Sequence, residues 1–333
     1  MKKLFIAIAA LAAMTSCSQD EVMEVAEKQA ISFGGAFVEK ATRAIDNASH
    51  TSTTLNSFNL YGTVINTNNG NNKVQLWNGV TALGTVGNST AWTGYADQYW
   101  IPNATYYFAA VVDANKVNLD ANYMPSTLEY TLAYDNQKDM LYNRVDRTNN
   151  TDYSIVKFNF THLLSKVYFT FNTTLSATGY NYQVSDIKIV SGLATSGVYN
   201  CSTNSWNELG ADTPKTGTTA TDDLLFGNIG ATANSDAATN LAATAQDSKF
   251  ARLIIPGKQT LNIEYTLHTL YNNTEIKSET KTATITDYTF AANTVYKINA
   301  EVGGLNKIEF TVNSIAGWSN ETNPTPLTPV AVQ

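Results

Sequence analysis

The chain has few residues of the kinds that carry out catalysis or hold metals. It contains three histidines, His50, His162 and His268, and more than 100 residues separate each from the next. Local metal-binding motifs place His, Cys or carboxylate ligands only a few residues apart. The sequence therefore predicts no metal site. We expect His162 to be a structural histidine and His268 to be solvated on the polar face of a strand.

The sequence also lacks complete versions of the short motifs that mark common catalytic and ion-binding sites. Pro256-Gly257-Lys258 resembles the end of a phosphate-binding loop, but Arg252 stands where that loop needs its first glycine. The chain has no Gly-x-Ser-x-Gly turn to present a nucleophilic serine, and Asp222-Asp223 lacks the alternating ligands of a calcium loop. We predict that the chain is not an enzyme and uses no cofactor. A pair of carboxylates of the glycosidase type stays open at this point.

The first residues predict export. Lys2 and Lys3 precede an apolar run from Leu4 to Ala13, and this layout indicates a signal peptide over residues 1–16. The run is shorter than the roughly 20 residues that a membrane-spanning helix needs. Small residues just before Cys17 resemble a lipoprotein box, in which the Cys17 sulfur receives diacylglycerol. The alternative is an ordinary cleavage site with an incidental cysteine.

We expect lipid on Cys17 to anchor the precursor in the outer membrane, since each buried CH₂ of an acyl chain contributes about 0.8 kcal/mol. Residues 18–21 read Ser-Gln-Asp-Glu and resemble the acidic tetrad that directs Bacteroidetes lipoproteins to the outer face. Cys201 is the only other cysteine. After lipidation no intramolecular disulfide can form, so stability must come from packing.

A candidate proteolytic site follows the first strand-like run. Ile31, Phe33 and the stretch 36–38 have the apolar pattern of a strand, and Lys-Ala-Thr-Arg43-Ala44 comes directly afterwards. A lone arginine is usually a solvated surface residue. At an exposed hinge, however, the bond between Arg43 and Ala44 would be open to an Arg-specific protease. We therefore predict a propeptide with an N-terminal strand over residues 17–43.

Alternation of apolar and polar residues predicts an all-β protein. Charged residues make up only 15% of the chain, and almost no helical periodicity is present. Three runs alternate cleanly: 261–267, 296–302 and 308–312. We interpret them as consecutive antiparallel strands of a β-sandwich with one face in water.

The length beyond Arg43 suits two domains of ~150 residues each. Apolar residues fall on even positions over 156–160 and on odd positions over 167–171. This change of phase between His162 and Ser165 indicates a bulge or bend. We predict an N-terminal sandwich over residues 44–155 and a C-terminal sandwich with a tail over residues 156–333.

The stretch 210–248 is rich in Thr, Ala, Asp, Asn and Gly, with one apolar island at 224–226. It predicts a long surface excursion. The aromatic residues Trp77, Trp92, Tyr95 and Trp100 suit either a sugar-stacking platform or a core, and we favour a core because large aromatics fill one efficiently.

Charge excludes one class of partner. The chain has 21 Lys and Arg against 28 Asp and Glu, a formal net charge of −7, and no basic run. Nucleic-acid binding needs clustered Lys and Arg to neutralise phosphates. We therefore expect no nucleic acid among the partners.

Several motifs follow one another along the chain: the box at Cys17, the motif around Arg43 and Ala44, Gln137-Lys-Asp-Met-Leu-Tyr142, Phe160-Thr-His-Leu-Leu-Ser-Lys-Val167, Asn293-Thr-Val-Tyr-Lys-Ile298 and Ile315-Ala-Gly-Trp318. Together they resemble the fimbrillin superfamily, the type V pilins and related lipoproteins of Bacteroidetes. Each motif alone is weak, but their order and spacing together are fairly specific. The resemblance covers nearly the whole chain.

The resemblance implies two tandem transthyretin-like β-sandwich domains of Greek-key type. It implies that an Arg-specific protease removes the N-terminal strand and opens a groove. A strand of an identical or related pilin subunit then fills that groove, in a donor-strand exchange. By analogy the donor is the C-terminal segment from about Asn313 to Gln333, or this end is a linker.

These features predict a stalk or tip subunit of a type V surface pilus that serves cell adhesion and meets a host or bacterial surface ligand. The precursor is expected in the cell outer membrane, and the mature subunit in the fimbria. The alternatives are a surface-exposed glycan-binding lipoprotein and a pilus anchor subunit.

Overall fold

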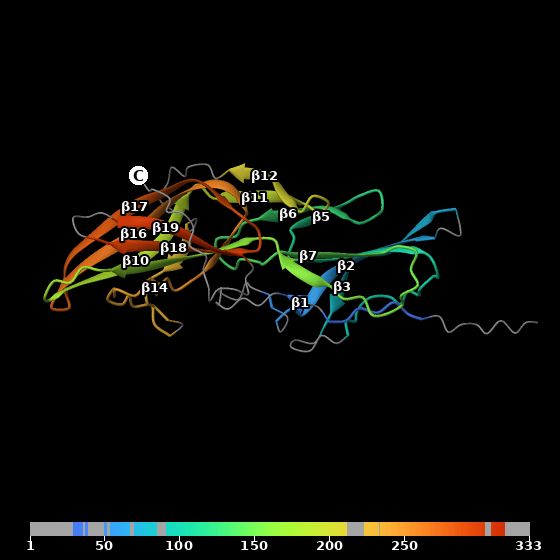
Figure 1. Ribbon diagram of the computed structural model, residues 1–333, viewed down its shortest axis with the longest axis horizontal. Helices are drawn as coiled ribbons and strands as arrows, with labels where there is room; N and C mark the ends of the chain where they lie inside the picture. Colours follow the sequence, from blue (N-terminus) through green and yellow to red (C-terminus); the bar gives the residue numbers. More distant parts are fainter. Residues whose placement is uncertain are drawn as a thin grey trace, which may run out of the picture.

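The structure is a computed structural model, and it describes residues 29–35, 37–38, 50–51, 54–66, 70–84, 91–211, 223–232, 234–303 and 308–316. The predicted all-β class is confirmed, because the regular elements in these ranges are strands and none is a helix. It follows that no helix in this part of the chain could cross a membrane. Figure 1 shows an elongated molecule with groups of sheets at its two ends.

A six-stranded sheet forms one end of the molecule, in the order β1-β8-β7-β4-β2-β3. The short β1 pairs with β8 in parallel, and the other neighbours pair antiparallel. The strands are β1 (Phe37–Val38), β2 (Ser57–Asn66), β3 (Asn72–Leu83), β4 (Thr105–Val112), β7 (Leu141–Arg147) and β8 (Asn159–His162).

A four-stranded antiparallel sheet, β12-β11-β6-β5, joins strands that are far apart in the sequence. Its strands are β5 (Lys116–Leu119), β6 (Pro125–Thr131), β11 (Ala194–Asn200) and β12 (Ser205–Ala211). β5 and β6 leave the first sheet between β4 and β7 and cross to β11. The two ends of the molecule are therefore tied together by backbone hydrogen bonds.

Two further sheets form the other end (Figure 1). One has the order β13-β10-β16-β17, and the second has the order β14-β9-β18-β19 with β15 also on β9. Their strands are β9 (Ser165–Thr173), β10 (Tyr180–Ser191), β13 (Leu224–Gly227), β14 (Gln246–Asp247), β15 (Arg252–Ile254), β16 (Gly257–Tyr271), β17 (Thr274–Phe290), β18 (Thr294–Val302) and β19 (Ile308–Ala316).

The three alternating runs near the C-terminus are strands β16, β18 and β19, but their predicted consecutive pairing is wrong in part. β18 and β19 are antiparallel partners as expected. β16 instead pairs with β10 and with β17, which the alternation did not reveal. The first half of β17 is mostly exposed on both faces and rich in Thr, Lys and Glu, so it has no apolar alternation to detect.

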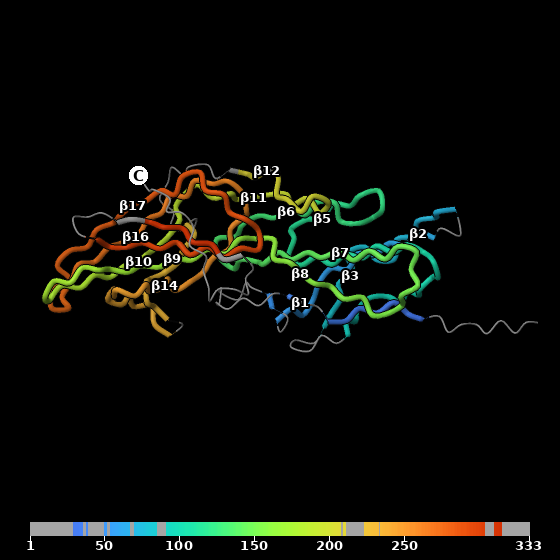
Figure 2. Tube along the Cα trace, in the orientation of Figure 1, coloured from blue at the N-terminus to red at the C-terminus, as the bar shows by residue number. Residues whose placement is uncertain are grey.

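The change of phase near His162 has a simple cause. Residues 156–160 contribute their apolar side chains to a first hydrophobic cluster, and residues 167–171 contribute theirs to a second. Figure 2 shows the chain passing from β8 to β9 between the two groups of sheets. Each strand faces a different core, so the inward positions need not share a phase. The domain boundary at 155/156 stays a prediction, and β8 still pairs within the first sheet.

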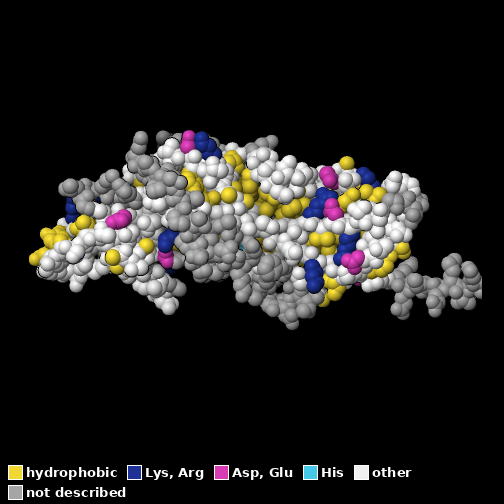
Figure 3. Space-filling model, viewed as in Figure 1, with side chains coloured by type: hydrophobic (Ala, Val, Ile, Leu, Met, Phe, Trp, Pro, Cys, Tyr) yellow, Lys and Arg dark blue, Asp and Glu magenta, His cyan; other side chains and the backbone are white. Residues whose placement is uncertain are grey.

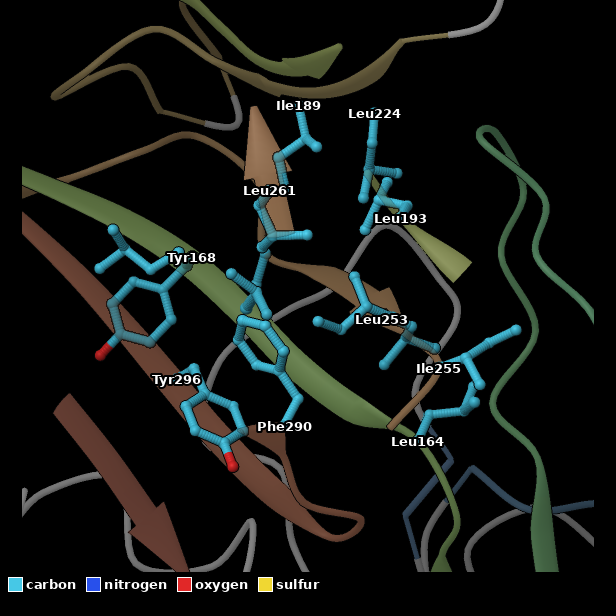
Figure 4. Packing of buried hydrophobic residues seen from close by; sticks show 14 of the residues in the cluster. Leu164, Tyr168, Ile189, Leu193, Leu224, Leu253, Ile255, Leu261, Phe290 and Tyr296 are labelled. Carbon is cyan, nitrogen blue, oxygen red and sulfur yellow. The ribbon is translucent and has the colours of Figure 1, made fainter. Parts of the chain in front are cut away.

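The second cluster fills the space between the sheets of β9 and β10. Figure 4 shows side chains from these sheets pointing toward one another, among them Leu253, Leu261 and Phe290. The apolar island in the predicted surface excursion is part of this core: Leu224 and Phe226 are fully buried on β13. That part of the prediction is wrong, because β13 covers the edge of β10. Residues 212–222 lie outside the described residues.

Candidate functional site

The segment before the predicted cleavage site, described at residues 29–35 and 37–38, is hydrogen-bonded on both sides. On one side the Ile31 amide donates to the Gln98 carbonyl at 2.7 Å, and the Trp100 amide donates to the Gln29 carbonyl at 3.0 Å. These bonds join the segment to residues 98–100, which precede β4.

On the other side the segment runs parallel to the chain leading into β8. The Gly34 amide donates to the Val156 carbonyl at 3.0 Å, and the Val156 amide donates to the Ser32 carbonyl at 2.9 Å. β1 continues this pairing, with Phe37 opposite Asn159. The segment is therefore extended and bonded on both sides, through isolated bridges at Ala30 and Phe33 and through the short strand β1.

Its side chains enter the first hydrophobic cluster. Ile31, Phe33 and Val38 are 2%, 1% and 0% exposed. The Phe33 ring is surrounded by four others, with centroids 5.2 to 5.6 Å away: Tyr95, Trp77, Phe108 and Phe158. Full burial of an aliphatic or aromatic side chain stabilises a fold by roughly 1.5–3 kcal/mol. This short segment is thus part of the core of the first sheet.

The described chain resumes at His50, which a pair of carboxylates holds. The His50 amide donates to Asp139 Oδ2 at 3.0 Å, and its Nε2 lies 2.8 Å from Asp113 Oδ2. The same Asp139 oxygen lies 2.9 Å from His162 Nδ1, and the side chains of that second pair are completely buried. Burial opposes the charged form of His50, but the hydrogen bond to Asp113 and the charges of both carboxylates outweigh it and raise the pKa of His50.

Gln137 joins the two ends of the molecule. Its Nε2 donates to the Leu253 carbonyl at 2.8 Å, and its Oε1 accepts from the Leu253 amide at 2.7 Å, so the side chain pairs with β15 as another strand would. Gln137 is 4% exposed. The motifs at 137–142 and 160–167, which the sequence marks only through the family resemblance, lie together at the junction of the two cores.

One serine, histidine and glutamate lie at the spacing of a hydrolase triad. His268 Nε2 is 2.8 Å from Ser185 Oγ, and His268 Nδ1 is 2.6 Å from Glu275 Oε2. The Ser185 hydroxyl, however, donates to Asp186 Oδ2 at 2.7 Å, so its proton points away from the imidazole. A histidine cannot act as base toward a proton held by another carboxylate. The predicted solvated His268 is instead bonded on a strand face.

The remaining candidate features are metal ligands, the Cys201 thiol and the tryptophan side chains. Among the described residues no three His, Cys, Asp or Glu side chains lie close enough to hold a metal ion. Burial raises the pKa of the Cys201 thiol to about 12, which keeps it protonated at neutral pH. Trp77, Trp92 and Trp100 are at most 7% exposed, which confirms their interpretation as core.

The three residues predicted to be modified or cut, Cys17, Arg43 and Ala44, lie outside the described residues. The structure does describe what flanks them: the buried segment ending at Val38 on one side and the bonded His50 on the other. Neither the tie at Gln137 nor the link from His50 to His162 was foreseen. No spacing in the sequence marks them.

In a comparison with known protein families, the model described as fimbrillin-like matches residues 42–318. The chain belongs to the fimbrillin-like family. This agrees with the motif order, and the matched range begins one residue before Arg43. No curated protein sequence matches this fimbrillin-like chain.

Solved structures share the fold of the fimbrillin-like chain. A fimbrial protein from Bacteroides vulgatus superimposes with a TM-score of 0.62 at 18% identity, covering 86% of this chain and 99% of its own. A protein from Bacteroides ovatus, provisionally assigned to cell adhesion, gives a TM-score of 0.50 at 15% identity and covers 86% of this chain and 96% of its own. At these identities the likeness concerns the fold.

Proposed function

We propose that this fimbrillin-like chain is a stalk or tip subunit of a surface pilus that serves adhesion. The precursor would be held at the outer membrane by lipid on Cys17. An Arg-specific protease would then cut between Arg43 and Ala44, and cut subunits would assemble by donor-strand exchange. Family membership supports the pilus role, and the names of the two structural neighbours agree with it.

The observation that carries this proposal is the docking of residues 29–38. The segment ends five residues before Arg43 and is held by hydrogen bonds and buried side chains. Once the bond after Arg43 is cut, the segment has no covalent link to the sheet it completes. Its departure would leave unpaired backbone groups at residues 98–100, at Val156 and on β8, with apolar sockets between them. Such an edge is a template for a strand of another subunit.

The donor in this proposal is the C-terminal segment. Residues 308–316 form β19 and pair along their whole length with β18. An exchange that leaves the subunit's own sheet intact would therefore use the residues after Ala316. These include Pro324, Pro326 and Pro329, which cannot donate to a ladder. At these three positions a donor strand could only accept hydrogen bonds through its carbonyl groups. Its backbone N–H groups would have to come from the residues between the prolines.

The test treats purified chain, lacking the leader, with an Arg-specific protease. Mass spectrometry of the new N-terminus should find Ala44, and unheated gels should then show a ladder of multimers. Arg43→Ala should abolish both the cut and the ladder, while an Arg147→Ala chain should still be cut at Arg43. A cut product that stays monomeric would refute assembly by exchange.

A further inference from the structure

A polar cleft lies where the two ends of the molecule meet, apart from the docked N-terminal segment. Its volume is ≈ 740 Å³, within the range of small-ligand sites. Residues of β7, the end of β8, the β11–β12 turn and the β17–β18 turn line it. Four segments that are remote in sequence therefore meet around one hollow.

The charged groups of the cleft form a pair with spare hydrogen-bonding capacity. Arg144 Nε donates to Asp146 Oδ1 at 2.7 Å, and the guanidinium lies 5.0 Å from the centre of the Tyr107 ring. The side chains of Arg144 and Asp146 are 32% and 43% exposed. Within the described residues, the two terminal nitrogens of Arg144 and the second oxygen of Asp146 make no hydrogen bond, so they can reach a ligand.

Two amides add donors to the same cleft. Asn143 Oδ1 accepts from the Asn159 amide at 3.3 Å, and Asn204 Oδ1 accepts from the Tyr199 hydroxyl at 3.1 Å. Each bond fixes the orientation of an amide whose NH₂ group makes no hydrogen bond to another described residue. The NH₂ groups of Asn143 and Asn204 are therefore available as donors, and the bonds to their Oδ1 atoms fix the orientation of both amides.

These groups select the chemistry of the ligand. Arg144 and Asp146 cancel in charge, so an anion would meet the carboxylate and a cation would meet the guanidinium. A hydroxyl group both donates and accepts, and several on one ring can satisfy the amides, the guanidinium and the carboxylate together. We infer that this cleft binds a neutral, polyhydroxylated sugar residue. Such a ligand deepens the proposed adhesive role, but the cleft needs neither cleavage nor assembly to form.

The test uses the intact, uncleaved chain and saturation-transfer NMR with glucose, galactose, mannose and N-acetylglucosamine at millimolar concentration. Glucuronate and glucosamine serve as charged probes of the same size. We expect transfer to at least one neutral sugar and weaker binding of both charged probes. Absence of transfer to all four neutral sugars, or stronger binding of a charged probe, would overturn the inference.

Two variants connect binding to this cleft. Arg144→Met should weaken sugar binding at least about tenfold, because it removes charge-assisted hydrogen bonds. Asp146→Asn should weaken it about fivefold, because it replaces the exposed charged acceptor of the cleft by a neutral amide. Lys116→Met, at a cation that is 60% exposed on β5, is the matched control and should bind as the parent does. Equal binding by all three variants would place the sugar elsewhere and refute the site.

Binding and assembly can fail separately. If the uncleaved chain binds sugar but the cut chain stays monomeric, the assembly proposal is wrong and the cleft stands. If multimers form and no sugar binds, the cleft inference alone is refuted.

Discussion

Replacing Phe33 by alanine tests whether the N-terminal segment is a structural part of the first core. The side chain is 1% exposed and contacts four aromatic rings. Large-to-small changes of a buried Phe cost about 3–5 kcal/mol, from lost transfer free energy and from the cavity left behind. Domains are usually stable by only about 5–15 kcal/mol. We therefore expect Phe33→Ala to remove a large share of the stability of the first sheet.

The assay is urea unfolding of the chain lacking its leader, followed by tryptophan fluorescence. Trp77, Trp92 and Trp100 belong to the first cluster, so they report on the sheet that the segment completes. The midpoint should fall by an amount corresponding to about 3–5 kcal/mol. A loss below about 1 kcal/mol would show that the segment adds little to the core and would contradict the packing described here.

Phe226→Ala is the matched control, because Phe226 is fully buried but belongs to the second cluster. It should cost a similar free energy in the intact chain. After cleavage at Arg43, however, only Phe33→Ala should speed the release of the N-terminal peptide, which size-exclusion chromatography can follow. Equal release rates for the two variants and the parent would mean that Phe33 does not hold the segment in place.

The remaining predictions concern the junction and one turn. Asp139→Ala leaves the buried His162 ring and the His50 amide without their shared acceptor, so it should cost about 3–5 kcal/mol in urea unfolding, and a loss under about 1 kcal/mol would refute the role of this carboxylate. The pKa of His50 is raised above its ordinary value of 6.5 in the folded chain, so its stabilisation is fully present below about pH 6.5 and is lost as the pH rises through the folded-state pKa; His50→Gln should remove that part of the pH dependence of the unfolding midpoint, and an unchanged profile would contradict it. Gly192 has φ of +90°, and a Cβ there would lie 1.6 Å from a carbonyl oxygen of β16, so Gly192→Ala should lower the melting temperature measured by circular dichroism, whereas Gly70→Ala, at a similar φ of +63° but in open space, should cost less.

Local features of the fold could be predicted from the sequence because burial leaves a period-two pattern. The strands over 296–302 and 308–312, the apolar segment at 31–38 and the change of phase after His162 all follow from which side chains face a core. β17 could not be predicted, because half of it faces water on both sides. β16 pairs with β17 and lies in a different sheet from β18, which the alternation of the two runs does not reveal.

The site was harder to foresee than the strands. The network of His50, Asp139 and His162 joins residues that are 23 and 89 positions apart, and Gln137 meets β15 across 116 positions. No local propensity encodes such contacts, since they arise only when the sheets are packed. The cleft beside β7 is of the same kind, because turns from two other sheets complete it.

The tethering of the N-terminal segment has a consequence for timing. While residues 29–38 and His50 belong to one chain, the segment is present at its own groove at an effective concentration in the millimolar range. A competing strand of another molecule at micromolar concentration is then at a disadvantage of about a thousandfold before any difference in contacts is counted. Cutting the tether cancels that advantage and lets dilution carry the freed peptide away. If the proposed cleavage takes place, an uncut precursor would therefore resist self-association even at high local concentration, and hydrolysis of the bond after Arg43 would permit assembly to begin.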